Sequence, residues 1–310
     1  MLITKIEECL AKLNIAKDQK IAVAVSGGSD SLALILGLKQ CGQKVFGLIV
    51  DHKLRQMSGD HALQTQDILY KNGIESEILI WEHDVILANI EGVARQNRYD
   101  LLLEKCNQMN IKYLFLGHHA DDQIETFLLN LSRGSGIDGL CSMPFCREQN
   151  NITIVRPCLD LHKKTLQDFL INNKIEWIED ETNQDLSIKR NKLRVVLQEL
   201  CPDLYEQRIL LAIDHLQQAK EILDRHYNKI YNDLYQNNKI DYLKYINLLP
   251  VERTWLLNKI LSKNNKIRLL EIKNLDKNIL NNIKKSTLAN YFIEIKNDSN
   301  ATLAIIFRPK

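Results

Sequence analysis

The residues best suited to chemistry form a short loop of serines and glycines near the N-terminus. Two adjacent glycines allow a tight turn whose backbone N–H groups can face an anion, and the dipole of a following helix adds positive potential. The serine hydroxyls can donate to phosphate oxygens, whereas Asp30 would repel them unless a divalent metal lay between. A serine-capped turn is the simpler alternative, but the loop predicts binding of ATP with Mg²⁺. Its residues are Ser26, Gly27, Gly28, Ser29, Asp30 and Ser31.

A second polar cluster follows the apolar segment 113–117. The dipole alone favours carboxylates on the first turn of a helix, but surplus charge where a strand meets a helix also suits a bound cation. The paired histidines lack the H-x-x-x-H spacing of a zinc-binding helix, so Mg²⁺ is favoured over zinc. The cluster comprises His118, His119, Asp121, Asp122 and Glu125, and the expected metal ligands are Asp30, Asp122 and Glu125.

Two further segments carry weaker signals. Asp51 and His52 follow an apolar run and could hold the edge of an adenine, although a solvated loop would look the same. Glu91, Arg95 and Arg98 share one face of a predicted helix. They could form a surface ion pair of little consequence, or the arginines could neutralise charge that develops at an α-phosphate. The pattern leaves both alternatives open.

Each of these polar groups follows a segment that predicts a buried strand. Apolar runs at 21–25, 44–50, 75–80 and 113–117 alternate with helical patterns. Continuous apolar strands that alternate with helices indicate a parallel sheet covered on both faces. Ligands of such sheets bind at the carboxyl ends of the strands. The sequence therefore predicts an α/β nucleotide-binding domain with its site along that edge.

The second half of the chain has a different pattern. Apolar residues at helical spacing predict a long amphipathic helix over 203–237, and 251–285 is also helical in character. The segment 288–308 predicts a terminal β-hairpin. We expect a catalytic domain over 1–205 and a smaller, mainly helical domain over 206–310. Residues 1–150 carry 15 basic and 19 acidic residues, leaving 26 and 20 in the remainder, so the basic second half suits a polyanion or a solvated surface.

Composition excludes several classes of protein. Hydrophobic residues make up 45% of the 310 residues and the net charge is +2, as expected of a globular protein. No apolar run is long enough for a membrane-spanning helix and no secretory signal opens the chain, so we expect a cytoplasmic protein without a membrane partner. The seven cysteines include no C-x-x-C pair, which favours reduced thiols over a metal site. The oligomeric state stays open, a homodimer included.

The phosphate loop resembles the S-G-G-x-D-S loop of the PP-loop ATP pyrophosphatases, and neither G-x-x-x-x-G-K-S/T nor G-x-G-x-x-G is present. Further segments resemble, in order, the motifs of tRNA(Ile)-lysidine synthases. They are G-H-H-x-D-D-Q-x-E-T at 117–126, R-G-x-G-x-x-G-L at 133–140, R-P-L-L at 156–159, W-x-x-D-x-S/T-N at 177–183 and R-N-x-x-R at 190–194. Cys158 stands where the family has leucine, a change between apolar side chains.

The resemblance implies an enzyme that uses ATP to adenylate the carbon-2 oxygen of the wobble cytidine in a tRNA(Ile) with a CAU anticodon. Free L-lysine then displaces AMP and gives lysidine. Mg²⁺ near Asp30, together with Arg95, would stabilise the added negative charge. The lysine amine must also lose a proton before it attacks. Candidate bases or lysine-binding groups are His119, Asp121 and Asp122, and candidate tRNA phosphate contacts are Arg133, Arg190 and Arg194, the last two of which could be simple surface charges.

The sequence gives less support to two other functions. A PP-loop tRNA thiolase often uses paired cysteines, which this sequence does not offer at C-x-x-C spacing. A relative without catalysis, binding only nucleotide or RNA, should have a degenerate phosphate loop, whereas the loop here is intact. Larger members of the family carry a further C-terminal domain, so we expect a shorter form whose basic C-terminal domain holds the tRNA.

Overall fold

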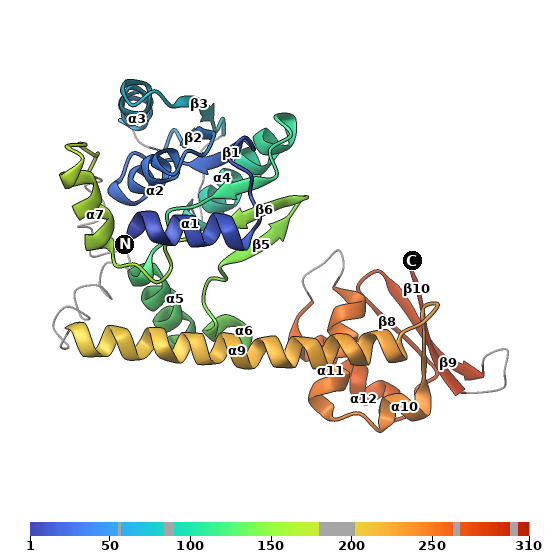
Figure 1. The fold of residues 1–310 in the computed structure, drawn as a ribbon. Coiled ribbons are helices and arrows are strands. Elements are labelled where there is room, and N and C mark those ends of the chain that lie inside the picture. Colours follow the sequence, from blue (N-terminus) through green and yellow to red (C-terminus); the bar gives the residue numbers. More distant parts are fainter. Residues whose placement is uncertain (55–56, 84–89, 180–201, 263–266, 298–302, 310) are drawn as a thin grey trace. The chain divides into compact units, whose positions relative to one another are not determined.

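A computed structural model describes residues 1–54, 57–83, 90–179, 202–262, 267–297 and 303–309. The chain forms two compact units, Met1–Leu216 and Gln217–Lys310 (Figure 1). The division falls inside α9 (Pro202–Leu234), the long helix that apolar periodicity predicted. The boundary proposed from the sequence, between 205 and 206, lies in the same helix.

The first unit contains a six-stranded sheet with the order β3-β2-β1-β4-β6-β5. Neighbouring strands pair in parallel from β3 to β6, and β5 pairs antiparallel to β6. The predicted α/β class with a parallel sheet is confirmed, while β5 and β6 were not predicted. The strands are β1 (Ile21–Ala24), β2 (Val45–Asp51), β3 (Glu75–Ile80), β4 (Tyr113–Phe115), β5 (Cys146–Gln149) and β6 (Ile152–Val155).

Helices cover both faces of this sheet. Along β1, Ile21 and Val23 join a core formed with α1, α2, α3 and α7, whereas Ala22 joins a core formed with α4. Successive strand residues point to opposite faces, so a strand buried on both faces must be apolar throughout. The helices are α1 (Leu2–Lys12), α2 (Ser29–Gln40), α3 (Ser58–Lys71), α4 (Ile90–Gln108), α5 (Ala120–Ser132), α6 (Ile137–Leu140) and α7 (Lys163–Asn172).

The second unit contains a four-stranded antiparallel sheet with the order β7-β10-β9-β8. The predicted terminal hairpin is confirmed as β9 and β10, and the structure adds β7 and β8 at its edges. The strands are β7 (Lys239–Asp241), β8 (Lys285–Leu288), β9 (Tyr291–Asn297) and β10 (Leu303–Pro309), and the helices are α10 (Tyr242–Ile246), α11 (Pro250–Leu261) and α12 (Leu269–Leu280). Within the described residues, no helix has both the length and the apolar character needed to cross a membrane.

A buried ion pair lies inside the second unit. Arg253 Nε donates to Asp276 Oδ1 at 2.9 Å, and the hydroxyl of Tyr245 donates to the same oxygen at 2.7 Å. Arg253 Nη1 also donates to Leu248 O at 2.6 Å. These short hydrogen bonds compensate the cost of burying the charges and join α10, α11 and α12.

Candidate active site

The phosphate loop (residues 26–31) turns at Gly27, whose φ of 85° is in the left-handed region. A Cβ atom there would lie 2.4 Å from Thr65 Oγ1, so the position also lacks room for a side chain. Ser31 closes the turn, because its Oγ accepts from Ser26 N at 3.1 Å and donates to Gly28 O at 3.1 Å. The predicted strand, turn and helix are confirmed. The amino end of α2 therefore lies at the carboxyl end of β1, where an anion is favoured.

A second glycine brings the histidine–aspartate cluster against this loop. Gly117 lies just beyond β4, and a Cβ atom on it would be 2.9 Å from the carbonyl carbon and oxygen of Asp30. The same atom would be 3.0 Å from Ser31 N. These are backbone atoms, which cannot move aside as a flexible side chain can. Only glycine permits this approach, which places His119, the N-cap of α5, beside Asp30.

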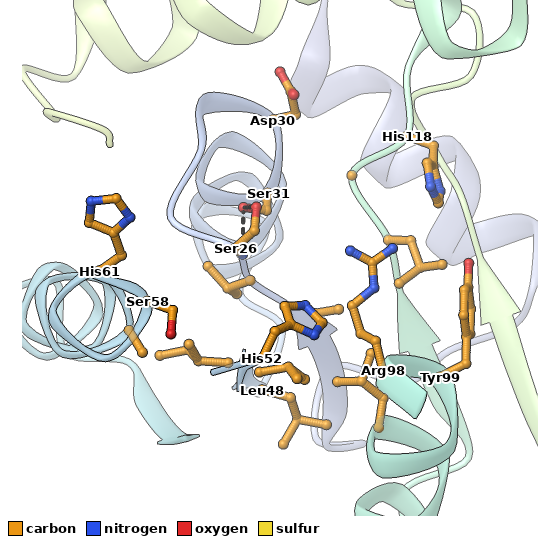
Figure 2. A pocket seen from close by; sticks show the side chains of 18 of the residues that line it. Ser26, Asp30, Ser31, Leu48, His52, Ser58, His61, Arg98, Tyr99 and His118 are labelled. Carbon is orange, nitrogen blue, oxygen red and sulfur yellow. Dashed lines mark hydrogen bonds between the residues drawn. The ribbon is translucent and has the colours of Figure 1, made fainter. Parts of the chain in front are cut away.

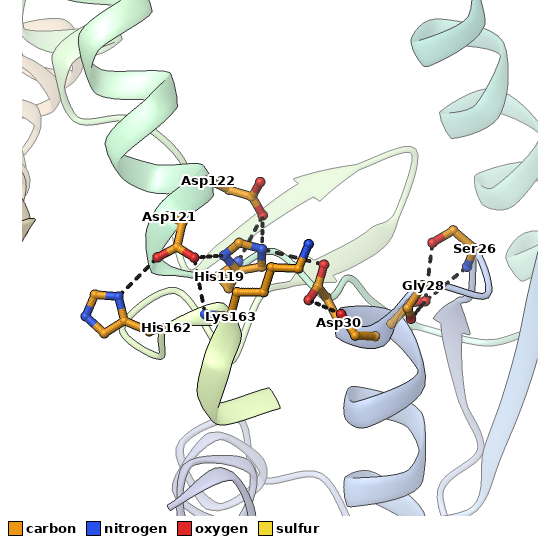
Figure 3. Close-up of polar contacts among 10 residues, drawn as sticks. Ser26, Gly28, Asp30, His119, Asp121, Asp122, His162 and Lys163 are labelled. Carbon is orange, nitrogen blue, oxygen red and sulfur yellow. Dashed lines mark hydrogen bonds and ion pairs between the residues drawn. The ribbon is translucent and has the colours of Figure 1, made fainter. Parts of the chain in front are cut away.

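His119 is surrounded by three carboxylates (Figure 3). Its Nε2 lies 3.5 Å from Asp30 Oδ2 and 3.5 Å from Asp122 Oδ2, and its Nδ1 lies 3.5 Å from Asp121 Oδ2. The side chain is 3% exposed, and within the described residues its Nδ1 makes no hydrogen bond. Four of the five residues proposed from the sequence as catalytic therefore converge at one point.

The charges of this cluster stabilise one another. Burial lowers the pKa of His119, but hydrogen bonding to Asp30 and the charges of the three carboxylates outweigh it, so the pKa is raised above 6.5. Burial raises the pKa of Asp30, but His119 and then Lys163 outweigh it, and the pKa is lowered. The protonated form of His119 and the ionised form of Asp30 therefore stabilise each other.

A neighbouring group extends the cluster. His162 Nδ1 lies 3.0 Å from Asp121 Oδ1 and 3.5 Å from Glu206 Oε2. Lys163 N donates to Asp121 Oδ2 at 3.3 Å. The half-buried side chains of Asp121, His162 and Glu206 offer ligand atoms within 4.8 Å of one another, close enough to share a cation. Sequence reasoning did not single out His162, although it follows the R-P-C-L segment by three residues.

A cavity of about 410 Å³ opens where the two clusters meet. Its volume is within the usual range for a small-molecule site. The phosphate loop, the end of β2, the side of α4 and the end of β4 line it (Figure 2). The apolar part of its lining includes Leu48, Val50, Leu102 and Leu116. The polar part includes Ser26, Asp30, Ser31, His118 and Asp122.

One end of the cavity is positively charged. The guanidinium carbons of Arg95, Arg98 and Arg147 lie 5.7, 5.9 and 5.9 Å from the centre of the Tyr99 ring. Arg98 and Tyr99 line the cavity, whereas Arg95, which the sequence favoured, is exposed and does not. The helical pattern placed both arginines on one face of α4, but spacing alone did not show which of them reaches the cavity.

His118 lies at this end and differs from its neighbour His119. Arg156 Nε donates to His118 Nδ1 at 3.2 Å. Burial, and then the charges of Arg156, Arg95 and Arg98, lower the pKa of His118 to about 3. His118 is therefore neutral at the pH at which His119 is charged. Neither His118 nor Arg156 was given a role from the sequence.

The remaining predicted residues are spread more widely. His52 lines the cavity, but the carboxylate of Asp51 accepts from Lys53 N at 3.0 Å and Ser58 Oγ at 2.6 Å in the loop after β2. Glu125 is buried one turn further along α5. Arg133 is exposed at the C-cap of α5. The predicted contacts Arg190 and Arg194 lie outside the described residues.

Known proteins match mainly the first of the two units of this chain. The family model described as a PP-loop domain matches residues 2–202. A tRNA(Ile)-lysidine synthase from Wolbachia sp. subsp. Brugia malayi (strain TRS) is 35% identical over 236 residues, which are 73% of this chain and 54% of the relative. One from Wolbachia pipientis wMel is 37% identical over 235 residues, with coverage of 73% and 54%. The enzyme of that name from Orientia tsutsugamushi (strain Boryong) is 36% identical, with coverage of 66% and 48%.

The chain spans about half the length of these curated relatives. Among solved structures, a U34-tRNA thiolase from Methanococcus maripaludis, determined with its 4Fe-4S cluster, matches with a TM-score of 0.59 at 15% identity and covers 70% of this chain and 78% of that one. At that identity the likeness concerns the fold alone. The family model covers well over half of the residues, and its match agrees with the loop and sheet described above. The chain therefore belongs to the PP-loop family.

Proposed function

We propose that this protein ligates L-lysine to carbon 2 of the wobble cytidine in a tRNA(Ile) with a CAU anticodon, forming lysidine and releasing AMP and pyrophosphate. One observation carries the proposal: a single cavity is lined by the phosphate loop and by the histidine–aspartate cluster. A site that must hold a nucleotide and then accept an amine needs both groups within reach of the same atoms. Similarity to the named synthases over 73% of the chain supports the choice of acceptor.

The phosphate loop would hold the pyrophosphate part of ATP. Ser26 and Ser31 line the cavity with hydroxyl groups, and the dipole of α2 favours an anion there. The oxygen donors of Asp30 and Asp122 suit Mg²⁺ and lie within 3.5 Å of the same His119 nitrogen. These two residues would hold Mg²⁺, which supplies Lewis-acid stabilisation of phosphate charge when it is bound.

The carboxylates beside His119 would receive the lysine. An ε-ammonium ion is attracted by acidic side chains, and it becomes a nucleophile only after it loses a proton. Asp121 and Asp122 project from the first turn of α5 toward His119 and can serve both purposes. The raised pKa of His119 favours its protonated form, which suits charge balance better than proton abstraction. For the tRNA we retain Arg133, Arg190 and Arg194 as proposed phosphate contacts.

Base thiolation has less support. The cysteines in the described part of the chain form no group of three donors that could hold a metal or cluster, since the only such group found there is Asp121, His162 and Glu206. The intact phosphate loop also argues against a function limited to binding a nucleotide or RNA without catalysis.

The proposal is tested with the full chain, ATP, Mg²⁺, L-lysine and a tRNA(Ile) transcript with a CAU anticodon. AMP and pyrophosphate are measured with each component omitted in turn, and the wobble nucleoside is analysed by mass spectrometry. We expect lysidine only in the complete mixture. AMP release without lysine incorporation would overturn the choice of acceptor or nucleophile, and a tRNA(Met) transcript with the same anticodon serves as the matched control.

A further inference from the structure

The R-P-C-L segment has no role in the function proposed above, yet the backbone holds it against the active site. Leu116 N donates to Val155 O at 2.9 Å, and Ala120 N donates to Leu161 O at 2.8 Å. Between these bonds His119 and Cys158 form a parallel bridge. The chain after β6 therefore runs alongside the chain after β4, which fixes Arg156 beside His118.

Arg156 is 3% exposed, and two hydrogen bonds fix the orientation of its guanidinium group. Nη1 donates to Pro144 O at 3.1 Å, and Nε donates to His118 Nδ1 at 3.2 Å. A guanidinium can only donate, so His118 Nδ1 must carry a lone pair. A neutral imidazole with a bare Nδ1 bears its proton on Nε2. Arg156 thus selects one tautomer of His118.

His118 lines the cavity, so its Nε2–H donor can reach a ligand bound there. His118, Tyr99 and Arg98 line the same end of it, and Figure 2 shows them on the side away from Ser58 and His61. Among the described residues, no acceptor takes a proton from His118 Nε2. The Nε2–H donor of His118, at this cationic end of the cavity, is therefore placed to donate to a ligand oxygen.

We propose that Arg156 is a positioning residue that holds His118 as an Nε2–H donor, and that His118 and Arg98 bind the non-bridging oxygens of the α-phosphate of ATP. The inference rests on the proposed ATP-dependent function. If the loop hydroxyls bind the two terminal phosphates and the apolar lining residues contact the base, the cationic end of the same cavity is left for the α-phosphate. When the base oxygen bonds to the α-phosphorus and the bond to pyrophosphate breaks, negative charge grows on those oxygens, and a fixed donor stabilises it.

The adenylation step can be measured alone, as exchange of labelled pyrophosphate into ATP that requires tRNA and no lysine. We expect His118→Ala to slow exchange about 10²-fold, as for loss of one fixed donor to a developing oxyanion, while the Kd for α,β-methylene-ATP changes less than about 3-fold. His118→Gln places an amide N–H near the Nε2 position and should restore part of the rate. Arg225→Lys, an exposed pair partner of Glu221, is the matched control and should not change the rate.

Arg156→Met tests whether Arg156 acts through His118. The double variant with His118→Ala should be no slower than His118→Ala alone, because coupled residues are not additive. Without Arg156 the Nδ1–H tautomer becomes accessible, and protonation at lower pH restores the Nε2 donor. Exchange by Arg156→Met relative to wild type should therefore rise as the pH falls. The charged or titratable groups that face His118 are Arg95, Arg98, Tyr99, His119 and Arg156.

A direct readout needs no activity. Nitrogen-15 NMR of labelled histidines should show a neutral Nε2–H tautomer for His118 at neutral pH in the wild type, assigned by its loss in His118→Gln. If wild type shows no tRNA-dependent exchange, the proposed function fails, whatever the NMR result. If wild type is active but His118→Ala exchanges at the wild-type rate, or if NMR shows the Nδ1–H tautomer, the inference is overturned and the proposed function stands.

Discussion

In the described residues, a buried cationic side chain is paired with acidic side chains in each unit, and the two clusters are built differently. Arg253, Asp276 and Tyr245 are joined by hydrogen bonds of 2.9 and 2.7 Å to a shared oxygen. His119 lies 3.5 Å from each of three carboxylates, and its Nδ1 makes no hydrogen bond within the described residues. The first cluster uses its bonding capacity internally. In the second, one polar atom, His119 Nδ1, stays without a hydrogen bond among the described residues.

This difference distinguishes buried charges that stabilise the fold from buried charges that serve a binding site. A buried charge is costly unless it is paired and hydrogen-bonded. Where short bonds compensate that cost, removal of a partner should unfold the unit. Where the carboxylates exceed the cations and the distances are long, removal should instead change binding or catalysis. Three substitutions test this distinction.

The largest effect is expected for Asp30→Ala. Loss of this carboxylate removes a proposed Mg²⁺ ligand next to the phosphate loop, so AMP formation should fall by about 10³-fold or more, while tRNA affinity stays within about 2-fold. AMP release and a tRNA-binding titration measure the two quantities. The exposed Asp18→Ala is the control. AMP formation at the normal rate would refute the metal assignment.

The second effect is on stability. Arg253→Met leaves Asp276 buried without its cation, which should cost about 3–5 kcal/mol in the free energy of unfolding of the second unit. Denaturant unfolding of the full chain, followed by tryptophan fluorescence, measures it, because Trp255 packs against the core of that unit. Arg308→Met breaks an exposed contact to Glu294 and should cost less than about 1 kcal/mol. Equal costs for the two substitutions would remove the proposed contrast.

The smallest effect is a pH dependence. The pKa of His119 is raised in the folded protein, so the stability that its charge contributes is complete below the unfolded value, 6.5, and is lost as the pH rises through the folded value. The difference in unfolding free energy between wild type and His119→Gln should therefore shrink as the pH rises above about 6.5. A difference that grows over this range would contradict the assigned charge state. In the other cluster burial raises the pKa of Tyr245, so it does not titrate there.

Much of the fold could be predicted because its strands are apolar on both faces. The run from Ile21 to Val25 is apolar at every position, unlike one face of an amphipathic helix, and the glycine pair after it located the phosphate loop. The edge strands β5, β7 and β8 were missed because they are three or four residues long and largely polar, so their pairing partners rather than their sequences define them.

The site was predictable where one segment carried the signal. The histidine–aspartate cluster lies within eight residues, so its convergence with Asp30 followed from the sheet edge alone. Arg156 and His162 come from later segments that pairing with the chain after β4 brings into place, and no local pattern reveals that pairing. Arg95 was preferred to Arg98 for a related reason: helical spacing gives a shared face but not the direction of a cavity.

The contact at Gly117 has a mechanical consequence. The backbone of this residue rests directly on the backbone of Asp30 and Ser31, with no side chain between them. The spacing between the first turn of α2 and the turn that begins α5 is therefore set by main-chain atoms in direct contact, and any side chain at position 117 would force these two turns apart.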